Sequence, residues 1–240
     1  ISVDDLTRIT SRGWPAIDSK QLGDWELRAS RGFTGRANSV AVHGSPGLPM
    51  DRALERVREF YAAHGIPALA QLVIGSSAER EFVDAGWVPR SAHHGGAVVQ
   101  VADLDPVYPR DPEAVVHDAV DDQWLARYGR ADLDPETART ILQKPRTVGF
   151  VSIGTPVLAI ARIVVTGEWA GISAVEVEPD ARGQGLGRRA VDASLAWAVE
   201  HGADKAYLQT MRSNAAALAL YGPYGFVDHH DYRYLEAPPG

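Results

Sequence analysis

The second half of the chain alternates between short apolar runs and amphipathic segments, which is the pattern of a protein built from strands and helices. Runs rich in Val, Ile and aromatic residues predict strands at 114–120, 147–153, 156–165, 170–177, 205–210 and 226–235. Apolar residues at helical spacing predict helices at 122–130, 135–144, around 191–198, and at 213–221. Ser213 is the predicted N-cap of the last helix. The pattern therefore predicts an α/β fold with a mixed sheet.

The first half of the chain has a similar order of elements, because residues 63–87 align with residues 200–226. The alignment superimposes two pairs of dipeptides, namely His64-Gly65 on His201-Gly202 and Gly86-Trp87 on Gly225-Phe226. Self-similarity of this kind indicates a duplicated structural unit. The sequence therefore predicts two related modules in tandem.

A proline-rich stretch at 102–112 separates the two halves. It contains three prolines and two Asp-Pro steps, which favour extended and irregular backbone. We place the domain boundary there, which gives a first module of residues 1–110 and a second of residues 111–240.

A glycine-rich turn lies between the predicted strand at 170–177 and the helix that follows it. It reads Arg182-Gly183-Gln184-Gly185-Leu186-Gly187-Arg188. The first N–H groups of a helix lack intrahelical partners, and the helix dipole adds about half a positive charge at this end. Glycines let the backbone curl around an anion, so a pyrophosphate would fit here. Arg182, Arg188 and Arg189 add positive charge at the same point.

The turn matches neither of the two common nucleotide-binding motifs. No Gly-Lys-Ser/Thr follows, as a P-loop would require, and Arg188 stands where the last glycine of a dinucleotide-binding motif would be. ATP and NAD are therefore disfavoured as ligands.

A second group of residues lies on the helix predicted at 213–221. Asn214, Ala217 and Tyr221 share one helix face, with Asn214 and Tyr221 about 10 Å apart along the axis. A long and thin ligand could contact both.

With these residues in place, the sequence resembles the GNAT superfamily of N-acetyltransferases that use acyl-CoA. Residues 177–187 (VEPDARGQGLG) are similar to its V-x-P-x-x-R-x-x-G-x-G signature, and residues 214–226 (NAAALALYGPYGF) are similar to its N-x-x-A-x-x-L-Y…G-F signature. The resemblance is strong over 114–235 and faint over the first half. It implies two GNAT-like modules, each a mostly antiparallel twisted sheet flanked by helices.

The resemblance also implies roles for individual residues. The cofactor-binding set consists of Val175, Val177, Arg182, Gly183, Gln184, Gly185, Leu186, Gly187, Arg188, Asn214 and Tyr221. In this set the backbone of residues 183–188 holds the pyrophosphate of acetyl-CoA, while strand 175–177 pairs with the pantetheine arm. Asn214 contacts the end of the pantetheine, and Tyr221 faces the sulfur.

The implied reaction is attack of an amine on a thioester, which releases coenzyme A as a thiol. Tyr221 is the candidate general acid for the leaving thiolate. The usual base of the family lies nine to eleven residues before the motif arginine, where this chain has Ser173 and Gly171. Glu176 is the nearest carboxylate that interrupts an apolar strand, and we consider it equally as a general base and as a solvent-facing side chain.

The first module has lost the features that would bind coenzyme A. The counterpart of its glycine-rich turn is residues 45–50 (SPGLPM), where two prolines donate no N–H and no arginine stands at the motif position. Phe82 replaces the tyrosine. This degenerate module is expected to wall the acceptor site, with Arg36 and Asn38 as candidates for contact with the acceptor beside the simpler interpretation of a solvated hairpin turn.

Histidines supply two further candidates. His230 lies on the predicted last strand and could relay a proton, although packing against the neighbouring aromatic residues is the more common role of such a histidine. His93 and His94 are adjacent, so they would point to opposite faces of a strand and could not bind one metal ion together.

Composition narrows the class of function. The 240 residues carry a net charge of −7, which disfavours binding to nucleic acid and mildly favours cationic substrates. The absence of cysteine excludes disulfides, thiolate metal sites and an acyl-cysteine intermediate. No apolar run is long enough to span a membrane, so we expect a cytoplasmic protein with no membrane partner. No metal is expected either, because the sequence has no H-E-x-x-H motif and no pairing of histidines and carboxylates at the spacing of metal ligands.

These observations predict an acetyl-CoA-dependent N-acetyltransferase that acts directly on the amine of a small molecule. A protein or peptide acceptor and a non-catalytic acyl-CoA sensor are the alternatives. A monomer is expected rather than a homodimer, because a tandem pair can replace the contact that single modules make by dimerising.

Overall fold

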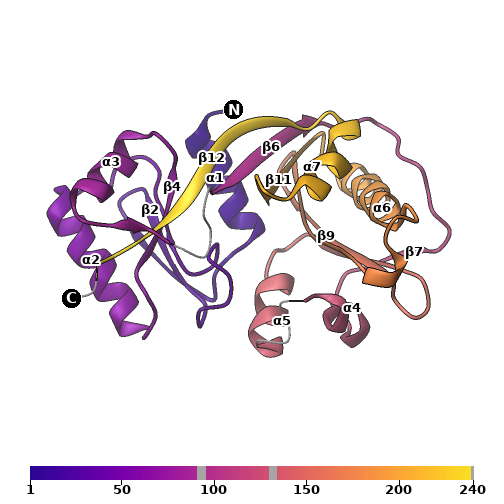
Figure 1. The fold of residues 1–240 in the computed structure, drawn as a ribbon, viewed down its shortest axis with the longest axis horizontal. Coiled ribbons are helices and arrows are strands. Elements are labelled where there is room, and N and C mark those ends of the chain that lie inside the picture. The colour runs from indigo at the N-terminus through magenta and orange to yellow at the C-terminus, as the bar shows by residue number, and fades with distance from the viewer. Residues whose placement is uncertain (91–95, 130–133, 239–240) are drawn as a thin grey trace. The chain divides into compact units, whose positions relative to one another are not determined.

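The computed structural model describes residues 1–90, 96–129 and 134–238, drawn in colour in Figure 1. Contacts divide the chain into two compact units. The first contains residues 1–99, 211–213 and 229–240, and the second contains residues 100–210 and 214–228. None of the helices in the described ranges is long and apolar enough to cross a membrane. The predicted boundary at 110 counts the last strand with the second module, whereas the contacts assign most of that strand to the first unit.

In its described residues the first unit contains three α-helices and a sheet. Its elements are α1 (Val3–Gly13), β1 (Asp18–Leu22), β2 (Trp25–Ala29), β3 (Val40–Ala41), α2 (Met50–Ala63), β4 (Leu69–Val73), α3 (Ser77–Asp84), β5 (Val88–Pro89), and parts of β6 (Ala97–Asp103) and β12 (Val227–Glu236). The strands follow the order β1-β2-β3-β4-β12, and β5 pairs with β12. The chain therefore returns from its C-terminal end to complete this sheet.

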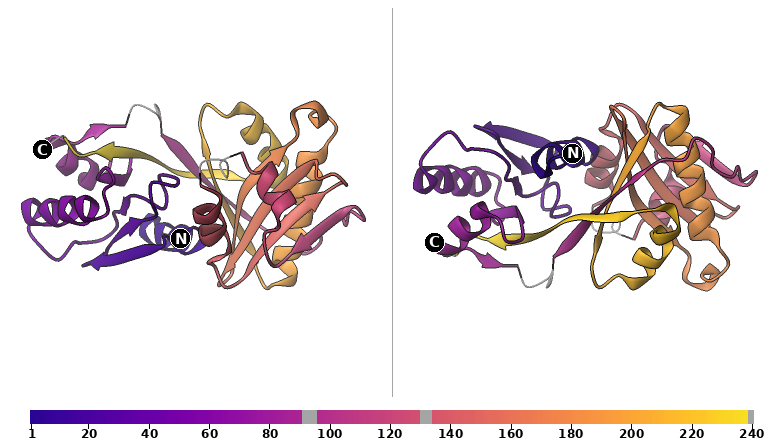
Figure 2. Two further views of the ribbon diagram at one scale, coloured as in Figure 1. Left: turned by 90° about the horizontal axis from the view of Figure 1, so that it is seen from below. Right: turned by 90° about the horizontal axis from the view of Figure 1, so that it is seen from above.

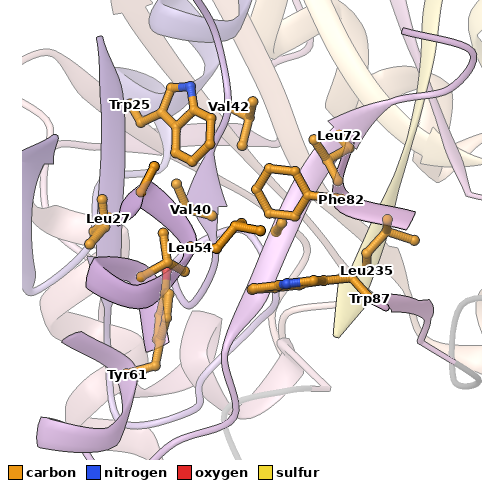
Figure 3. Packing of buried hydrophobic residues seen from close by; sticks show 13 residues of the cluster. Trp25, Leu27, Val40, Val42, Leu54, Tyr61, Leu72, Phe82, Trp87 and Leu235 are labelled. Atoms are coloured by element: carbon orange, nitrogen blue, oxygen red, sulfur yellow. The ribbon is translucent and has the colours of Figure 1, made fainter. Parts of the chain in front are cut away.

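Aromatic and aliphatic side chains fill the space between this sheet and helices α2 and α3 (Figure 3). Trp25 packs on Phe82 with ring centroids 5.5 Å apart, and Phe82 packs edge-on against Trp87 at 4.9 Å. Leu235 of β12 is fully buried in the same cluster. The last strand is thus part of the core of the first unit.

The second unit holds the remaining elements. They are β7 (Ala114–His117), α4 (Asp122–Arg127), α5 (Pro135–Gln143), β8 (Val148–Ile153), β9 (Ala159–Thr166), β10 (Trp169–Val177), α6 (Leu186–Glu200), β11 (Lys205–Met211) and α7 (Ala215–Tyr221). The strand order is β6-β11-β10-β9-β8-β7. Strands β7 to β10 pair antiparallel in sequence, while β10 and β11 pair in parallel. The prediction of a mixed, mostly antiparallel sheet flanked by helices is confirmed.

Strand register separates the two faces of this sheet. On one face Ile163, Ile172 and Leu208 pack with Val191 and Leu195 of α6. On the opposite face the ring of Phe150 packs on that of Trp124 in α4, with ring centroids 5.2 Å apart. Figure 2 shows α6, in orange, running along one side of these strands. Strand register places further residues on the same face as Phe150 and Trp124, because residues paired across strands point to one side of a sheet. The pairs are Phe150–Arg162, Arg162–Ser173, Gly171–Val164 and Gly171–Tyr207. Arg162, Ser173 and Tyr207 are the polar side chains among these residues.

The ends of the helices match between the two units, as the internal repeat predicts. His64 follows α2, and its Nδ1 lies 2.8 Å from the carbonyl oxygen of Phe60. The rings of His64 and Phe60 also pack together, with centroids 4.4 Å apart. His201 follows α6, and its Nδ1 lies 2.7 Å from the carbonyl oxygen of Trp197, on which it stacks at 3.8 Å. Repeated contacts of this detail support the tandem arrangement.

A buried arginine is repeated as well. Arg28 is the fourth residue of β2 and Arg162 the fourth of β9, and they are 2% and 1% exposed. Arg28 donates to the side chain of Ser39 at 3.1 Å, and Arg162 donates to that of Ser173 at 3.4 Å. Register places Ser173 opposite Arg162, and extending the pairing of Glu26 with Ala41 by two residues places Ser39 opposite Arg28. This second equivalence was not visible in the sequence alignment.

Candidate active site

The parallel strands β10 and β11 separate at their carboxyl ends. Their pairing runs from Trp169–Lys205 to Ile172–Leu208, after which β10 continues to Val177 beside β9 alone. A bulge interrupts the β9 register between Ser173 and Glu176, and Ala174 adopts a left-handed φ of 51°. Among the described strands, none therefore pairs with this edge of β10 from Ser173 to Val177, which is the region where a pantetheine arm was predicted to pair.

The glycine-rich turn follows directly and leads into α6. Gly183 and Gly185 have φ values of 77° and 78°, and no atom lies within 4 Å of the position of a Cβ on either residue. The first bond of the helix runs from Arg189 N to Gly185 O at 3.1 Å. Among the residues that the structure describes, no acceptor bonds the backbone N–H groups of residues 183–188. Free N–H groups and a helix N-terminus make this turn suited to an anion.

The three arginines of this region have different surroundings. The Nε of Arg182 donates to the carbonyl oxygen of Val177 at 3.3 Å, which ties the turn to the end of β10. The guanidinium of Arg188 lies 5.9 Å from the ring centre of Tyr224 and is exposed. Arg189 instead forms ion pairs with Asp111 and Glu113. The expectation that Arg189 adds its charge to the anion site is therefore wrong, because two carboxylates neutralise it.

Gly187 and Leu186 hold the turn against the rest of the unit. Leu186 is buried in a cluster with Val151 and Ala190. The Cβ position of Gly187 lies 3.6 Å from Val177 and 3.7 Å from Leu220, so the start of α6 touches both β10 and α7. Gln184 is exposed at the tip of the turn.

Helix α7 starts one residue later than the sequence predicts. Asn214, not Ser213, is its N-cap, because the Oδ1 of Asn214 accepts the N–H of Ala217 at 3.1 Å. The Nδ2 of Asn214 remains on an exposed side chain. Capping and contact with a ligand are thus compatible roles for this residue.

Tyr221 ends α7 in a mostly apolar setting. Its side chain is 6% exposed, and its ring packs edge-on against Phe226 at 5.7 Å. Burial raises the pKa of the Tyr221 hydroxyl above its usual 10, so the phenol keeps its proton at neutral pH. Within the described ranges no partner forms a hydrogen bond with that hydroxyl, yet it is not among the enclosed polar atoms that lack one. The hydroxyl is therefore accessible to a water molecule or a ligand atom, to which it can donate a proton.

Glu176 lies just after the bulge and is partly exposed. Its Oε2 accepts the N–H of Gly129 at 3.0 Å, and none of the described residues forms an ion pair with it. The next carboxylate, Glu178, forms an ion pair with Arg127. Glu176 is thus the carboxylate of this strand that is left to receive a proton.

The turn of the first unit differs at each of these points. Ser45 N is bonded to Asp24 Oδ2 at 2.8 Å, Gly44 N to Asp4 Oδ2 at 3.1 Å, and Gly47 N to Ser45 Oγ at 3.1 Å. Side chains of the unit already use these N–H groups, and two of the acceptors are negatively charged. An anionic ligand would be repelled here.

Other residues singled out in the sequence lie elsewhere. Asn38 is 4% exposed and ties its own loop together, accepting the N–H groups of Ser30 and Gly32 and donating to Phe33 O and Thr34 O. Arg36 stacks on Trp14, with its Cζ 4.0 Å from the ring centre. The interpretation as a solvated turn is wrong for Asn38, whose buried side chain is occupied by the backbone of its own loop.

The histidine candidates also have local contacts. His229 and His230 approach each other with their Nδ1 atoms 2.8 Å apart, and His229 Nε2 lies 3.2 Å from the carbonyl oxygen of Ile1. Burial and the neighbouring His229 lower the pKa of His230 to about 4. His93 and His94 lie outside the described residues. No group of three or more His, Cys, Asp or Glu side chains in the described parts of the chain is arranged to hold a metal ion.

Tyr207 was missed by the sequence reasoning. It pairs with Gly171 on the parallel strand, and its hydroxyl oxygen lies 2.3 Å from the position that a Cβ on Gly171 would take. The phenol therefore covers the glycine. A glycine inside an apolar strand was the available signal, but only the register reveals which side chain needs the space.

Comparisons with known proteins identify the family of this chain. A family model described as "Probable histone acetyltransferase Rv0428c C-terminal" matches residues 2–235. The uncharacterized N-acetyltransferase YobR of Bacillus subtilis is 25% identical over 247 positions, which cover 95% of this chain and 96% of that protein. The probable histone acetyltransferase Rv0428c of Mycobacterium tuberculosis is 28% identical, covering 97% of this chain and 73% of that protein.

Two solved structures share the fold. A GCN5-related N-acetyltransferase from Kribbella flavida superimposes with a TM-score of 0.68 at 18% identity, covering 99% of this chain and 96% of the other. A tandem GNAT protein from the clavulanic acid biosynthesis pathway gives a TM-score of 0.64 at 16% identity, covering 84% and 76%. The chain belongs to the acetyltransferase family of the Rv0428c C-terminal region, and it has the fold of GNAT N-acetyltransferases.

Proposed function

We propose that this protein transfers the acetyl group of acetyl-CoA directly to the amine of a small molecule, and that residues 111–240 form the catalytic module. The observation that carries the proposal is the set of free N–H groups at residues 183–188, next to the free edge of β10. Arg182 and Arg188 stand beside these groups. A pyrophosphate held there would gain roughly 0.3–1 kcal/mol from each favourable contact with the helix end.

The free edge of β10 supports a place for the pantetheine arm. Val175 and Val177 lie on the stretch that no longer pairs with β11, so their backbone groups can bond an extended ligand as a neighbouring strand would. Asn214 would contact this arm through its Nδ2. Substrate bound along this edge would carry its thioester toward Tyr221.

The residues present can serve the proton transfers of the reaction. The amine nitrogen forms a bond to the thioester carbon while the carbon–sulfur bond breaks. An alkylamine with a pKa of about 10.4 is protonated at neutral pH, so it loses one proton to reach its attacking form and a second proton as the amide forms. Glu176 receives these two protons in turn, directly or through water, and passes the first to water before it takes the second. Tyr221 donates its proton to the sulfur as thiolate forms.

The small-molecule acceptor has one competitor. The family model and the mycobacterial relative carry the name histone acetyltransferase, which favours a lysine of a protein as the alternative acceptor. The carboxylate of Glu176 suits either kind of ammonium group. The third possibility, a sensor that binds acyl-CoA without catalysis, gives Tyr221 no chemical role.

One experiment separates these functions. Thiol release from acetyl-CoA is measured with a panel of small amines and with lysine-containing and free N-terminal peptides, beside calorimetry of coenzyme A binding. Faster thiol release with a small amine than with any peptide is the expected result. Preference for a histone-like peptide would replace the acceptor, and binding without transfer to any acceptor would indicate a sensor.

A further inference from the structure

The bulge in β10 determines which side chains face the acceptor. Before the bulge, Gly171 and Ser173 lie on the face that carries α4 and α5. After it, Glu176 pairs with Ile160 and its carboxylate meets Gly129, which directly follows α4, so it lies on the same face. Tyr221 belongs to the cluster on the α6 face. The proposed base and the proposed acid therefore approach the end of the β10–β11 pair from opposite sides of the sheet.

Tyr207 belongs to the side of Glu176. It lies on β11 one residue before the last pairing with β10, and it is 6% exposed. Its ring reaches across Gly171, where a Cβ would lie 2.3 Å from the hydroxyl oxygen and 2.4 Å from Cζ. Because glycine leaves this space open, the hydroxyl is held over β10 next to the point where the two strands separate.

Polar groups surround this position on the same face. Ser173 is the next residue of β10 on this face, and Arg162 donates to its Oγ at 3.4 Å. Arg162 is itself fixed by a 3.0 Å bond from its Nε to the carbonyl oxygen of Leu142 in α5. Arg162 and Tyr207 are buried and Ser173 is half-buried, so a polar ligand group at this end of the strand pair would meet polar side chains instead of an apolar surface.

Resting on the proposed function, we propose that Tyr207 is an acceptor-binding residue, whose hydroxyl oxygen accepts a hydrogen bond from the attacking amine and so directs the nitrogen lone pair at the thioester. Tyr207 gains and loses no proton over the cycle. Gly171 is required because only a residue without a side chain leaves room for the phenol. The acceptor class that fits is a primary amine, because its neutral form has two N–H groups: one loses its proton to Glu176 as the amide forms, and the other bonds Tyr207, whereas a neutral secondary amine has a single N–H.

Two substitutions and one control test the proposal. Tyr207→Phe removes only the hydroxyl, and Gly171→Ala forces the phenol out of its place. The control is Tyr108→Phe, which removes the hydroxyl of another buried tyrosine of the second unit that accepts the Asp105 N–H at 3.0 Å on the α6 side. Initial rates give KM and kcat for the best amine found in the acceptor panel and for acetyl-CoA, and calorimetry gives the coenzyme A affinity.

The expected result is about a tenfold or larger rise in the KM for the amine in both site variants, with the KM for acetyl-CoA and the coenzyme A affinity unchanged. Tyr108→Phe should leave all kinetic constants unchanged. An unaltered amine KM and kcat/KM in Tyr207→Phe would overturn the proposal while the acetyltransferase function stands. So would a parallel loss of coenzyme A affinity, since the residue would then act on the whole fold.

Failure of the proposed function gives a different result. In that case the unsubstituted protein itself transfers acetyl to no amine, and the assignment of Tyr207 is overturned with it. Melting temperatures of the three variants show whether each is folded. If Gly171→Ala alone unfolds, Tyr207→Phe still decides the question.

Discussion

Tyr221 is buried against apolar side chains, and no described residue forms a hydrogen bond with its hydroxyl. Replacing it by phenylalanine keeps the packing and removes the proton donor. We expect Tyr221→Phe to lower kcat by about 100-fold or more while coenzyme A binds normally, because general acid catalysis contributes about 10²–10⁴. Rapid-quench or steady-state thiol release measures the change. Tyr61→Phe, which alters an equally buried phenol of the first unit, should lose some stability and no activity.

The same burial sets the pH range of the acid. Because the folded-state pKa of Tyr221 is raised above 10, the phenol remains protonated and active at every pH below 10. We therefore expect no loss of kcat from phenol ionisation between pH 8 and pH 10 in a pH–rate profile. A decline centred near pH 9 that disappears in Tyr221→Phe would contradict this assignment.

Arg28 shows what a buried cation requires. All of the side-chain partners given by the structure are neutral, namely Ser11, Ser39 and Gln71, and the guanidinium also donates to Ser39 O. Arg28→Met would leave these acceptors unsatisfied in the interior, so we expect a loss of about 2–4 kcal/mol in the free energy of unfolding, measured with urea. Arg52→Met removes an exposed ion pair with Glu55 and should leave the free energy of unfolding nearly unchanged. An equal effect of the two would show that the buried contacts are not needed.

At the scale of elements, the turn before α6 offers a matched comparison. Gly185 and Gly202 have φ values of 78° and 88°, and neither Cβ position has an atom within 4 Å. Alanine at either position should therefore cost a similar 1–2 kcal/mol of backbone strain. Only Gly185→Ala places a methyl group where the phosphates are proposed to bind, so only this variant should weaken coenzyme A binding, by at least tenfold in calorimetry. Equal affinities in the two variants would argue against this turn as the pyrophosphate site.

Local patterns predicted most elements and the turn. The strand predicted at 170–177 is β10 at Trp169–Val177, and the predicted strand at 205–210 is β11 at Lys205–Met211. Periodicity and glycine spacing are local properties, so the sequence carries them directly. The N-cap moved by one residue because Ser213 and Asn214 are both good caps, and the competition is decided by backbone geometry.

Local sequence patterns could not predict how distant strands pair. The separation of β10 from β11, the bulge at Ala174 and the position of Tyr207 over Gly171 all follow from register, which is fixed by the packing of the whole sheet. Arg189 does not serve the anion site because it pairs with Asp111 and Glu113, which lie more than 70 residues earlier in the chain. Sequence therefore identified which residues could bind, and the fold decided which of them are free.

At the scale of the whole molecule, two related units differ in one capacity. The second has free N–H groups at residues 183–188, whereas the first bonds those of Gly44 and Ser45 to aspartates. We expect calorimetry to give one coenzyme A per chain, and Gly47→Ala in the first unit to leave the affinity unchanged. Two equivalent sites per chain would show that the first turn rearranges to bind.

Residues 232–236 of β12 pair with β4, and Leu235 is enclosed in the core that forms around Trp25 and Phe82. The ribosome makes β4 more than 150 residues before this partner strand, so the sheet of the first unit stays open at this edge of β4 until residues 232–236 have been made. Until then the opposing edge of β4 is exposed to chaperones and to wrong strands. A substitution in residues 232–236 would consequently disturb the folding of the first unit.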